Sequence, residues 1–95
     1  LEKVVEKMCH APADIFQVKE RGYIKKGYWA DLVLVDLNSD QKVEKSNIYY
    51  KCKWSPFENY IFKSKISHTF VNGNLVYENG TFYETKMGRA LGFER

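Results

Sequence analysis

The chain has 95 residues, of which 44% are hydrophobic and 28% are charged, and its formal net charge is +3. Chains of this length form one small domain with a thin core, and this composition is typical of globular proteins rather than disordered or membrane proteins. No apolar run approaches the roughly 18 residues that span a bilayer, so we expect no membrane association. The positive charge is mild and scattered, and we therefore expect no nucleic-acid partner.

The two cysteines, Cys9 and Cys52, lie far apart in the sequence, and no signal-peptide pattern precedes the first element. Nothing indicates the secreted setting in which such a pair would form a disulfide. We therefore expect reduced thiols in a cytoplasmic protein.

Residues 1–21 are expected to be helical. Apolar side chains recur at the spacing of one helix face, formed by Leu1, Val4, Val5 and Met8. Pro12 is expected to end this helix and to begin a second one, because proline suits the first helical turn. Ile15 and Phe16 are the apolar anchors of the second helix. Because the helical pattern already includes Leu1, we expect the chain to be a piece of a longer protein.

Residues 22–95 are expected to form a β-domain, so the predicted fold class is α+β and mainly β. The stretch DLVLVDL (31–37) has four consecutive apolar residues between aspartates, as in a strand buried on both faces. The stretch QKVEK (41–45) alternates like an edge strand, and NIYYKCK (47–53) is a weaker strand pattern. The tail at 85–95 is expected to add a turn of helix or to fray.

The strongest local pattern predicts a three-stranded meander at about residues 64–85. Its β-rich runs are joined by two Asn-Gly pairs, at residues 72–73 and 79–80. Asn-Gly is the preferred pair for a two-residue type I′ turn, because both positions need a positive φ.

The position of His68 in this meander depends on the turns. If both turns have two residues, His68 aligns with Tyr77 and Phe82 on one apolar face, as a half-buried core histidine. A one-residue bulge would move one side of the pairing to the opposite face.

The stretch WSPFE (54–58) predicts a short helical corner between strands. Ser55 at the N-cap, Pro56 at the first helical position and Glu58 two positions later form a capping box. The apolar side chains of this corner are those of Trp54, Phe57, Tyr60 and Ile61. The predicted strands offer them little surface, which indicates a missing partner domain.

Four side chains could donate to a metal ion, namely Cys9, His10, Cys52 and His68. None of them shows CxxC, HxH or HxxxH spacing, and adjacent residues at a helix end point in different directions. A catalytic zinc needs three protein ligands and an open position, so we predict no metal site in this chain.

Other chemistry is equally unsupported. Ser55 has a capping role, and neither cysteine has a nearby histidine in a recognisable motif. Asp31 and Asp36 flank a strand at an interval that puts them on opposite faces. We expect core or interface packing rather than base stacking for the aromatic residues Tyr49, Tyr50, Trp54 and Phe57. We therefore predict no catalytic and no cofactor-binding residue.

Four stretches together resemble dihydroorotases of the amidohydrolase superfamily. GYIKKGYWADLVLVD (22–36) is similar to the segment that follows the catalytic barrel, and TFVNGNLVYENG (69–80) is similar to the closing hairpin. Between them, KWSPFE (53–58) resembles the S-P-F-E corner characteristic of dihydroorotases, and APADIF (11–16) resembles their Asn-Pro-Ala helix start. The first and last motifs fit many amidohydrolases, whereas SPFE narrows the choice.

The sequence departs from the family pattern at three positions. Ala11 stands where the family usually has an asparagine cap, and Asn59 and Ser64 stand where glycines are common. Asparagine tolerates a left-handed backbone, so Asn59 in place of glycine costs little conformational energy. Ser64 leaves the geometry of its bend open.

The resemblance implies the C-terminal part of a zinc-dependent enzyme that interconverts N-carbamoyl-L-aspartate and L-dihydroorotate in pyrimidine biosynthesis. Residues 1–21 would end the TIM barrel, and residues 22–95 would form part of the small composite β-sandwich domain beside it. The family's zinc ligands and catalytic aspartate lie upstream, and this chain has no HxH pair. It would carry no catalytic residue, pack against the remainder of the parent chain, and form a homo-oligomer when isolated. The alternative is a free-standing β-rich binding module.

Overall fold

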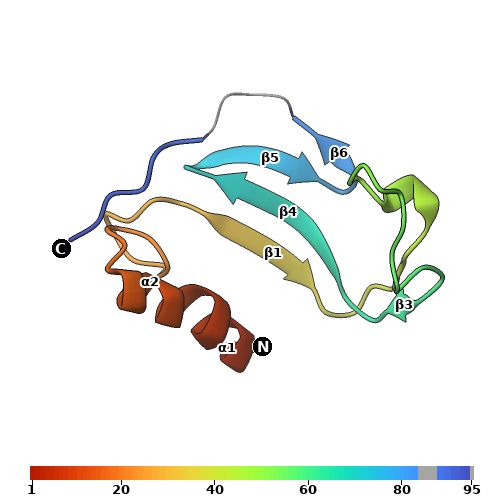
Figure 1. The fold of residues 1–95 in the computed structure, drawn as a ribbon, viewed down its shortest axis with the longest axis horizontal. Helices are drawn as coiled ribbons and strands as arrows, with labels where there is room; N and C mark the ends of the chain where they lie inside the picture. The colour runs from red at the N-terminus through yellow and green to blue at the C-terminus, as the bar shows by residue number, and fades with distance from the viewer. Residues whose placement is uncertain (84–87, 95) are drawn as a thin grey trace. The chain divides into compact units, whose positions relative to one another are not determined.

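The computed structural model describes residues 1–83 and 88–94, and the end of the predicted meander beyond residue 83 lies outside the described residues. An N-terminal helical segment precedes mostly antiparallel strands, so the α+β, mainly β class is confirmed (Figure 1). The chain divides into two compact units: unit 1 is Leu1–Leu32, Phe70–Asn74 and Thr85–Arg95, and unit 2 is Val33–Thr69 and Leu75–Glu84. In the described part of the chain, no helix has the length and apolar character needed to cross a membrane.

The N-terminal segment is one continuous helical run. The α-helix α1 (Glu2–Val5), the π-helical η1 (Glu6–His10) and the α-helix α2 (Ala11–Phe16) follow one another without a break. The Ala11 N–H donates to the Glu6 carbonyl, and this wider π turn leads into Pro12, which has no N–H of its own. The prediction that Pro12 separates two helices was therefore wrong.

The helical run ends at Phe16 through backbone bonds rather than through a glycine. Gln17 adopts the left-handed conformation with φ 56° and ψ 44°. The Val18 N–H donates to the Ala13 carbonyl at 2.9 Å, and the Gln17 N–H donates to the Asp14 carbonyl at 3.3 Å. This pair of bonds is a Schellman motif, which satisfies carbonyls that the helix leaves open.

Gly22 lies directly against the helix that precedes it. A Cβ atom at this position would lie 2.4 Å from the Ala13 Cβ and 2.9 Å from the Cys9 carbonyl oxygen. The φ of Gly22 is also +88°. Only glycine fits this approach, and it buries Ala13, one of the most enclosed side chains of the described structure.

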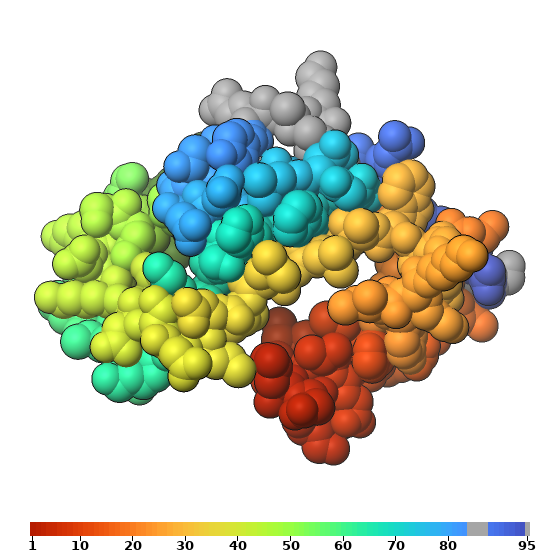
Figure 2. All heavy atoms as spheres, turned by 180° about the vertical axis from the view of Figure 1, so that it is seen from behind, coloured from red at the N-terminus to blue at the C-terminus, as the bar shows by residue number. Residues whose placement is uncertain are grey.

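The C-terminal segment pairs with the chain that follows α2. The Lys19 N–H donates to the Gly92 carbonyl at 2.8 Å, and the Glu94 N–H donates to the Gln17 carbonyl at 2.9 Å. Figure 2 shows the blue atoms of this segment beside orange atoms of the N-terminal third. The expectation of a helical turn was wrong for residues 88–94, and the expectation of fraying was wrong for residues 92–94, which pair with the segment after α2.

Four strands form the larger sheet, in the order β1-β4-β5-β6. They are β1 (Leu32–Asp36), β4 (Lys65–Val71), β5 (Asn74–Glu78) and β6 (Thr81–Phe82). Neighbouring arrows in Figure 1 run in opposite directions. A second sheet pairs β2 (Gln41–Lys42) with β3 (Ile61–Phe62) in antiparallel register.

Both Asn-Gly turns have the predicted geometry. The φ values are 51° and 84° for Asn72 and Gly73, and 44° and 93° for Asn79 and Gly80. All four are positive, as a type I′ turn requires. The second turn has two residues, because Glu78 pairs with Thr81 in the antiparallel register of β5 and β6.

Three strand predictions need correction. The run 31–37 does form a strand, but Val33 is 51% exposed, so burial on both faces was wrong. The strand at 41–45 shortens to β2, and 47–53 forms no strand. Instead, the 3-10 helix η2 (Lys45–Asn47) precedes an irregular stretch.

Local side-chain bonding accounts for η2. The Glu44 N–H donates to the Asn47 Oδ1 at 2.9 Å, and the Asn47 Nδ2 donates to the Lys42 carbonyl at 2.8 Å. Such bonds give the backbone an alternative to a strand ladder. A capping box is therefore found here, between Glu44 and Asn47.

The core is thin. Ala13 and Ile48 are the buried apolar side chains among the described residues, at 8% and 4% exposure. The predicted helical stripe is open, and its residues Leu1, Val4, Val5 and Met8 are all exposed. Strand β1 forms an edge of its sheet.

Candidate functional site

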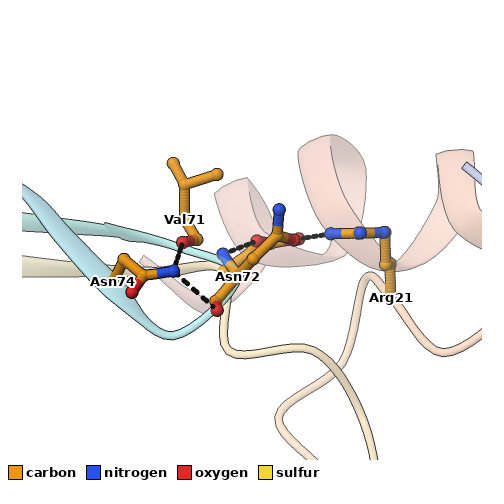
Figure 3. A network of polar contacts seen from close by, with 5 residues as sticks. Arg21, Val71, Asn72 and Asn74 are labelled. Atoms are coloured by element: carbon orange, nitrogen blue, oxygen red, sulfur yellow. Dashed lines mark hydrogen bonds and ion pairs between the residues drawn. The ribbon is translucent and has the colours of Figure 1, made fainter. Parts of the chain in front are cut away.

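Asp31 links the segment before β1 to the turn between β4 and β5 (Figure 3). Its carboxylate accepts a hydrogen bond from the Asn72 N–H at 2.8 Å and forms an ion pair with the Arg21 guanidinium. The Gly73 N–H donates to the Ala30 carbonyl at 2.9 Å. We call these three contacts the Asp31 latch. They tie three separate stretches of unit 1 together.

The Asp31 latch is partly shielded from water. The Arg21 side chain is 11% exposed and the Asp31 side chain is 39% exposed. The Arg21 guanidinium lies 5.3 Å from the centre of the Trp29 ring, and the Arg89 guanidinium lies 5.0 Å from it. Cation–π contact and a charge-assisted hydrogen bond both strengthen when water is excluded. The arrangement is that of a structural anchor.

His10 belongs to a second cluster in unit 1. Its ring stacks on Tyr23 with centroids 4.1 Å apart and an interplanar angle of 6°. The Tyr23 hydroxyl donates to the Asp14 Oδ2 at 2.7 Å. This hydrogen bond, together with desolvation, raises the pKa of Tyr23 above its ordinary value. The cluster fixes the loop after α2 on the helix.

His68 lies beside Glu78 of the neighbouring strand. Its Nε2 lies 3.7 Å from the Glu78 Oε1, and the Tyr83 hydroxyl donates to the Glu78 Oε2 at 3.2 Å. Tyr77 and Phe82 pair as predicted, and the alignment of His68 with them stays a prediction. The hydrogen bond to Glu78 raises the pKa of Tyr83.

Ser55 caps a turn rather than a helix. Its Oγ accepts a hydrogen bond from the Phe57 N–H at 3.1 Å, and its carbonyl accepts one from the Glu58 N–H at 3.2 Å. Asn59 then adopts a φ of 71°, and its N–H donates to the Val43 carbonyl at 2.7 Å. The left-handed residue ends the turn before a helix can form, so the predicted helical corner was wrong in extent. Asn59 holds the conformation that glycine would supply.

Aromatic side chains gather around this corner. The ring centroids are 6.2 Å apart for Phe57 and Tyr60, 5.8 Å for Phe57 and Phe62, and 4.7 Å for Tyr60 and Phe62. Trp54 is 63% exposed and Phe57 is 53% exposed. We call Trp54, Phe57, Tyr60 and Phe62 the aromatic corner. It presents apolar surface to solvent in this chain.

The possible metal donors do not come together. Within residues 1–83 and 88–94, no three His, Cys, Asp or Glu side chains lie close enough to hold an ion. His10 stacks on an aromatic ring, and the Cys52 thiol lies 3.8 Å from the Trp54 carbonyl oxygen. The described residues therefore do not fit a zinc site.

Sequence reasoning missed the Asp31 latch. It weighed Asp31 only as a possible partner of Asp36, whose Oδ1 instead accepts a hydrogen bond from the Asn38 N–H at 3.0 Å. The available signal was that Asp31 and Asn72 both lie in motifs of one resemblance. Their contact spans 41 positions, which no local pattern reveals.

A family model described as the amidohydrolase family matches residues 1–76. The chain belongs to the amidohydrolase family. An allantoinase from Desulfitobacterium hafniense (strain Y51) is 32% identical over 91 residues, which cover 96% of this chain and 20% of the relative. A dihydroorotase from Endomicrobium trichonymphae is 38% identical over 78 residues, which cover 82% of this chain and 18% of that protein.

The solved structure of an L-hydantoinase (dihydropyrimidinase) from Arthrobacter aurescens resembles this amidohydrolase chain with a TM-score of 0.81. The two are 35% identical, and the match covers 88% of this chain and 19% of the other. The chain thus spans about a fifth of the length of the relatives it matches. The family resemblance read from the sequence, including its similarity to dihydroorotases, is confirmed.

The Asp31 latch explains why this amidohydrolase chain combines two of its motifs. The A-D-L-V segment supplies the acceptors, which are the Ala30 carbonyl and the Asp31 carboxylate. The Asn-Gly hairpin supplies the donors, which are the backbone N–H groups of Gly73 and Asn72. Each motif provides the hydrogen-bond partner of the other. The Asp31 latch is therefore a structural anchor between these two motifs.

Proposed function

We propose that the chain is the C-terminal structural part of a dihydroorotase, a zinc-dependent hydrolase that interconverts N-carbamoyl-L-aspartate and L-dihydroorotate in pyrimidine biosynthesis. The observation that carries the proposal is WSPFE at residues 54–58, within a chain that resembles proteins named dihydroorotase at 33% and 36% identity. The Ser55-capped turn and the aromatic corner are the structural counterpart of that stretch. In the parent, the chain would support the catalytic barrel as part of a small β-domain.

A second candidate is an allantoinase, because such a relative is matched over 96% of this chain. Both activities open a cyclic amide, so the same assay separates them. The full-length parent would be tested with L-dihydroorotate, allantoin and hydantoin. We expect ring opening of dihydroorotate alone. Opening of allantoin without turnover of dihydroorotate would replace the proposal with the second candidate.

We propose that the zinc ion is held outside this chain, since the described residues bring no three suitable donors together. The isolated chain would then open no dihydroorotate ring and retain no stoichiometric zinc. Metal analysis after dialysis against a metal-free buffer tests the second point. One zinc ion per chain would contradict it.

The partner we propose for the open apolar surface is the remainder of the parent chain. Met8 is 73% exposed, Ile15 is 74% exposed, and both lie on the helical run that would end the barrel. Burial is worth about 25 cal/mol per Å² of apolar surface, so several hundred Å² favour association strongly. Without the parent, the chain would form a homodimer or larger assembly. Light scattering should report at least twice the monomer mass, and a monomer that persists on dilution would favour a free-standing module.

We place the parent in the cytoplasm. Cys9 and Cys52 are both free and exposed, as thiols in a reducing compartment remain. Fractionation of cells that produce the tagged parent would test this location.

A further inference from the structure

The chain contains two Asn-Gly pairs in turns of the same type, and Asn-Gly is the dipeptide most open to spontaneous loss of the asparagine amide. The reaction begins when the glycine backbone nitrogen attacks the preceding asparagine side chain, and glycine offers no Cβ to obstruct it. We propose that Asn79 is a deamidation site of this protein and that the Asp31 latch protects Asn72 from the same reaction.

The reaction balances with water alone. The Gly80 nitrogen forms a bond to the Asn79 Cγ, and the side-chain amide leaves as ammonia with the proton of the Gly80 amide. A five-membered succinimide results. Water then opens it at the Cγ to give aspartate, or at the backbone carbonyl to give isoaspartate. No oxidant or reductant takes part.

The two turns share most of the features that govern this reaction. Asn72 and Asn79 have φ values of 51° and 44°, and their glycines have 84° and 93°. The backbone N–H of each asparagine is hydrogen bonded at 2.8 Å, to the Asp31 Oδ1 for Asn72 and to the Ser67 carbonyl for Asn79. Intrinsic sequence and turn geometry therefore do not separate the two sites.

The attacking nitrogen does separate them. The Gly73 N–H donates to the Ala30 carbonyl at 2.9 Å, so its approach to the Asn72 side chain requires that this bond break. Within residues 1–83 and 88–94, no hydrogen bond donated by the Gly80 N–H is found. The nucleophile is thus held at one turn and available at the other.

The surroundings of the side chains point the same way. The Asn72 side-chain oxygen is buried, and the Asn74 Nδ2 donates to the Asn72 carbonyl at 3.2 Å (Figure 3). Both glycines are exposed and a Cβ on either would meet no atom within 4 Å, so the difference lies in the asparagines: Asn79 is exposed, whereas Asn72 is half-buried. Water and the rearrangement that closes the ring therefore have access to Asn79.

The strands beside the two turns also differ in length and in their position in the sheet. The Asn79 turn leads into β6, a two-residue strand at the edge of its sheet. The Asn72 turn joins β4 and β5, which have seven and five residues. Short edge elements open locally more often than longer inner ones, and succinimide formation requires such opening.

Isoaspartate at position 79 would change the hairpin. Its backbone runs through the Cβ, so the turn gains one atom and no longer fits the register in which Glu78 pairs with Thr81. Either product also places a new carboxylate next to Glu78, which already contacts His68 and Tyr83. The modification would therefore weaken the pairing of β6.

The test is an incubation of the 95-residue chain at mildly alkaline pH, followed by digestion with a glutamate-specific protease. Cleavage after Glu78 places the two asparagines in separate peptides. Mass spectrometry then measures acid formed at each position, and protein isoaspartate methyltransferase labelling identifies the isomer. We expect Asn79 to react about five to ten times faster than Asn72, the factor that corresponds to one net hydrogen bond.

Two further arms isolate the role of the fold. In urea the two rates should become equal, because both sites are then plain Asn-Gly dipeptides. Asp31→Ala removes the two side-chain contacts that hold the Asn72 turn beside Ala30, so the bond from the Gly73 N–H to the Ala30 carbonyl should open more often. The rate at Asn72 should then rise towards that at Asn79, while the rate at Asn79 stays unchanged. Equal rates in the native chain, or a native difference that persists in urea, would overturn the proposal. If Asp31→Ala fails to fold, the comparison of native and urea-treated chain decides.

Discussion

Gly22→Ala is the substitution for which the structure gives the sharpest expectation. The added Cβ would lie 2.4 Å from the Ala13 Cβ and 2.9 Å from the Cys9 carbonyl oxygen. Both distances are far below ordinary contact, and one atom belongs to a helix backbone that cannot swing aside. The φ of +88° adds backbone strain for any residue with a Cβ.

Gly27→Ala separates the two effects. Gly27 has the same φ of +88°, but a Cβ placed there would meet no atom within 4 Å. This control should therefore lower the free energy of unfolding by the backbone term alone, about 1–2 kcal/mol. Gly22→Ala should lower it by a further 1–3 kcal/mol or so, the usual cost of overpacking.

Urea unfolding followed by circular dichroism measures both variants. The double variant Gly22→Ala, Ala13→Gly removes the closer of the two clashes, so it should recover part of the loss despite the helix cost of about 1 kcal/mol for glycine. A double-mutant cycle then gives the coupling between the two positions. The reasoning is refuted if Gly22→Ala is no more destabilising than Gly27→Ala.

Three more expectations concern single contacts. Asp31→Ala removes two contacts of the Asp31 latch and should lower the free energy of unfolding by about 2 kcal/mol. The control Asp36→Ala, at the other end of β1, should lower it by about 1 kcal/mol or less. Equal losses in urea unfolding would count against the latch. Ser55→Ala should cost about 1 kcal/mol through the lost cap and leave turnover of the folded parent unchanged, and a large fall in turnover at unchanged thermal stability would show a catalytic role instead. The raised pKa of Tyr23 means that its contribution to stability is present below the unfolded value near pH 10 and is lost as pH rises through the folded value. Absorbance titration of the phenol should show a lower pKa in Asp14→Ala, and an unchanged titration would exclude the hydrogen bond as the cause.

Short-range chemistry was read correctly from the sequence. The two Asn-Gly pairs form type I′ turns because only a few residues accept two consecutive positive φ values, and that restriction is local. The strand at 32–36 formed because β-branched side chains such as Val33 and Val35 favour extended backbone. Asn59 took the left-handed conformation for the same local reason.

Predictions failed where a distant or competing contact decided the outcome. The stretch 47–53 lost its strand because the Glu44 and Asn47 bonds close a 3-10 turn just before it. The helix continued past Pro12 because a π turn accommodates the missing N–H.

The sequence by itself determined the family, the fold class and the type of both hairpin turns, since these depend on residue order and on backbone restrictions within a few residues. The tertiary structure alone decided which residues of the motifs contact one another. Asp31 meets Asn72 across 41 positions, and Gly22 meets Ala13 at a distance no side chain would tolerate. Both contacts arise from chain packing, which brings together groups whose separation along the sequence carries no periodic signal. The same packing makes one Asn-Gly turn sheltered and the other exposed, although the two dipeptides are identical.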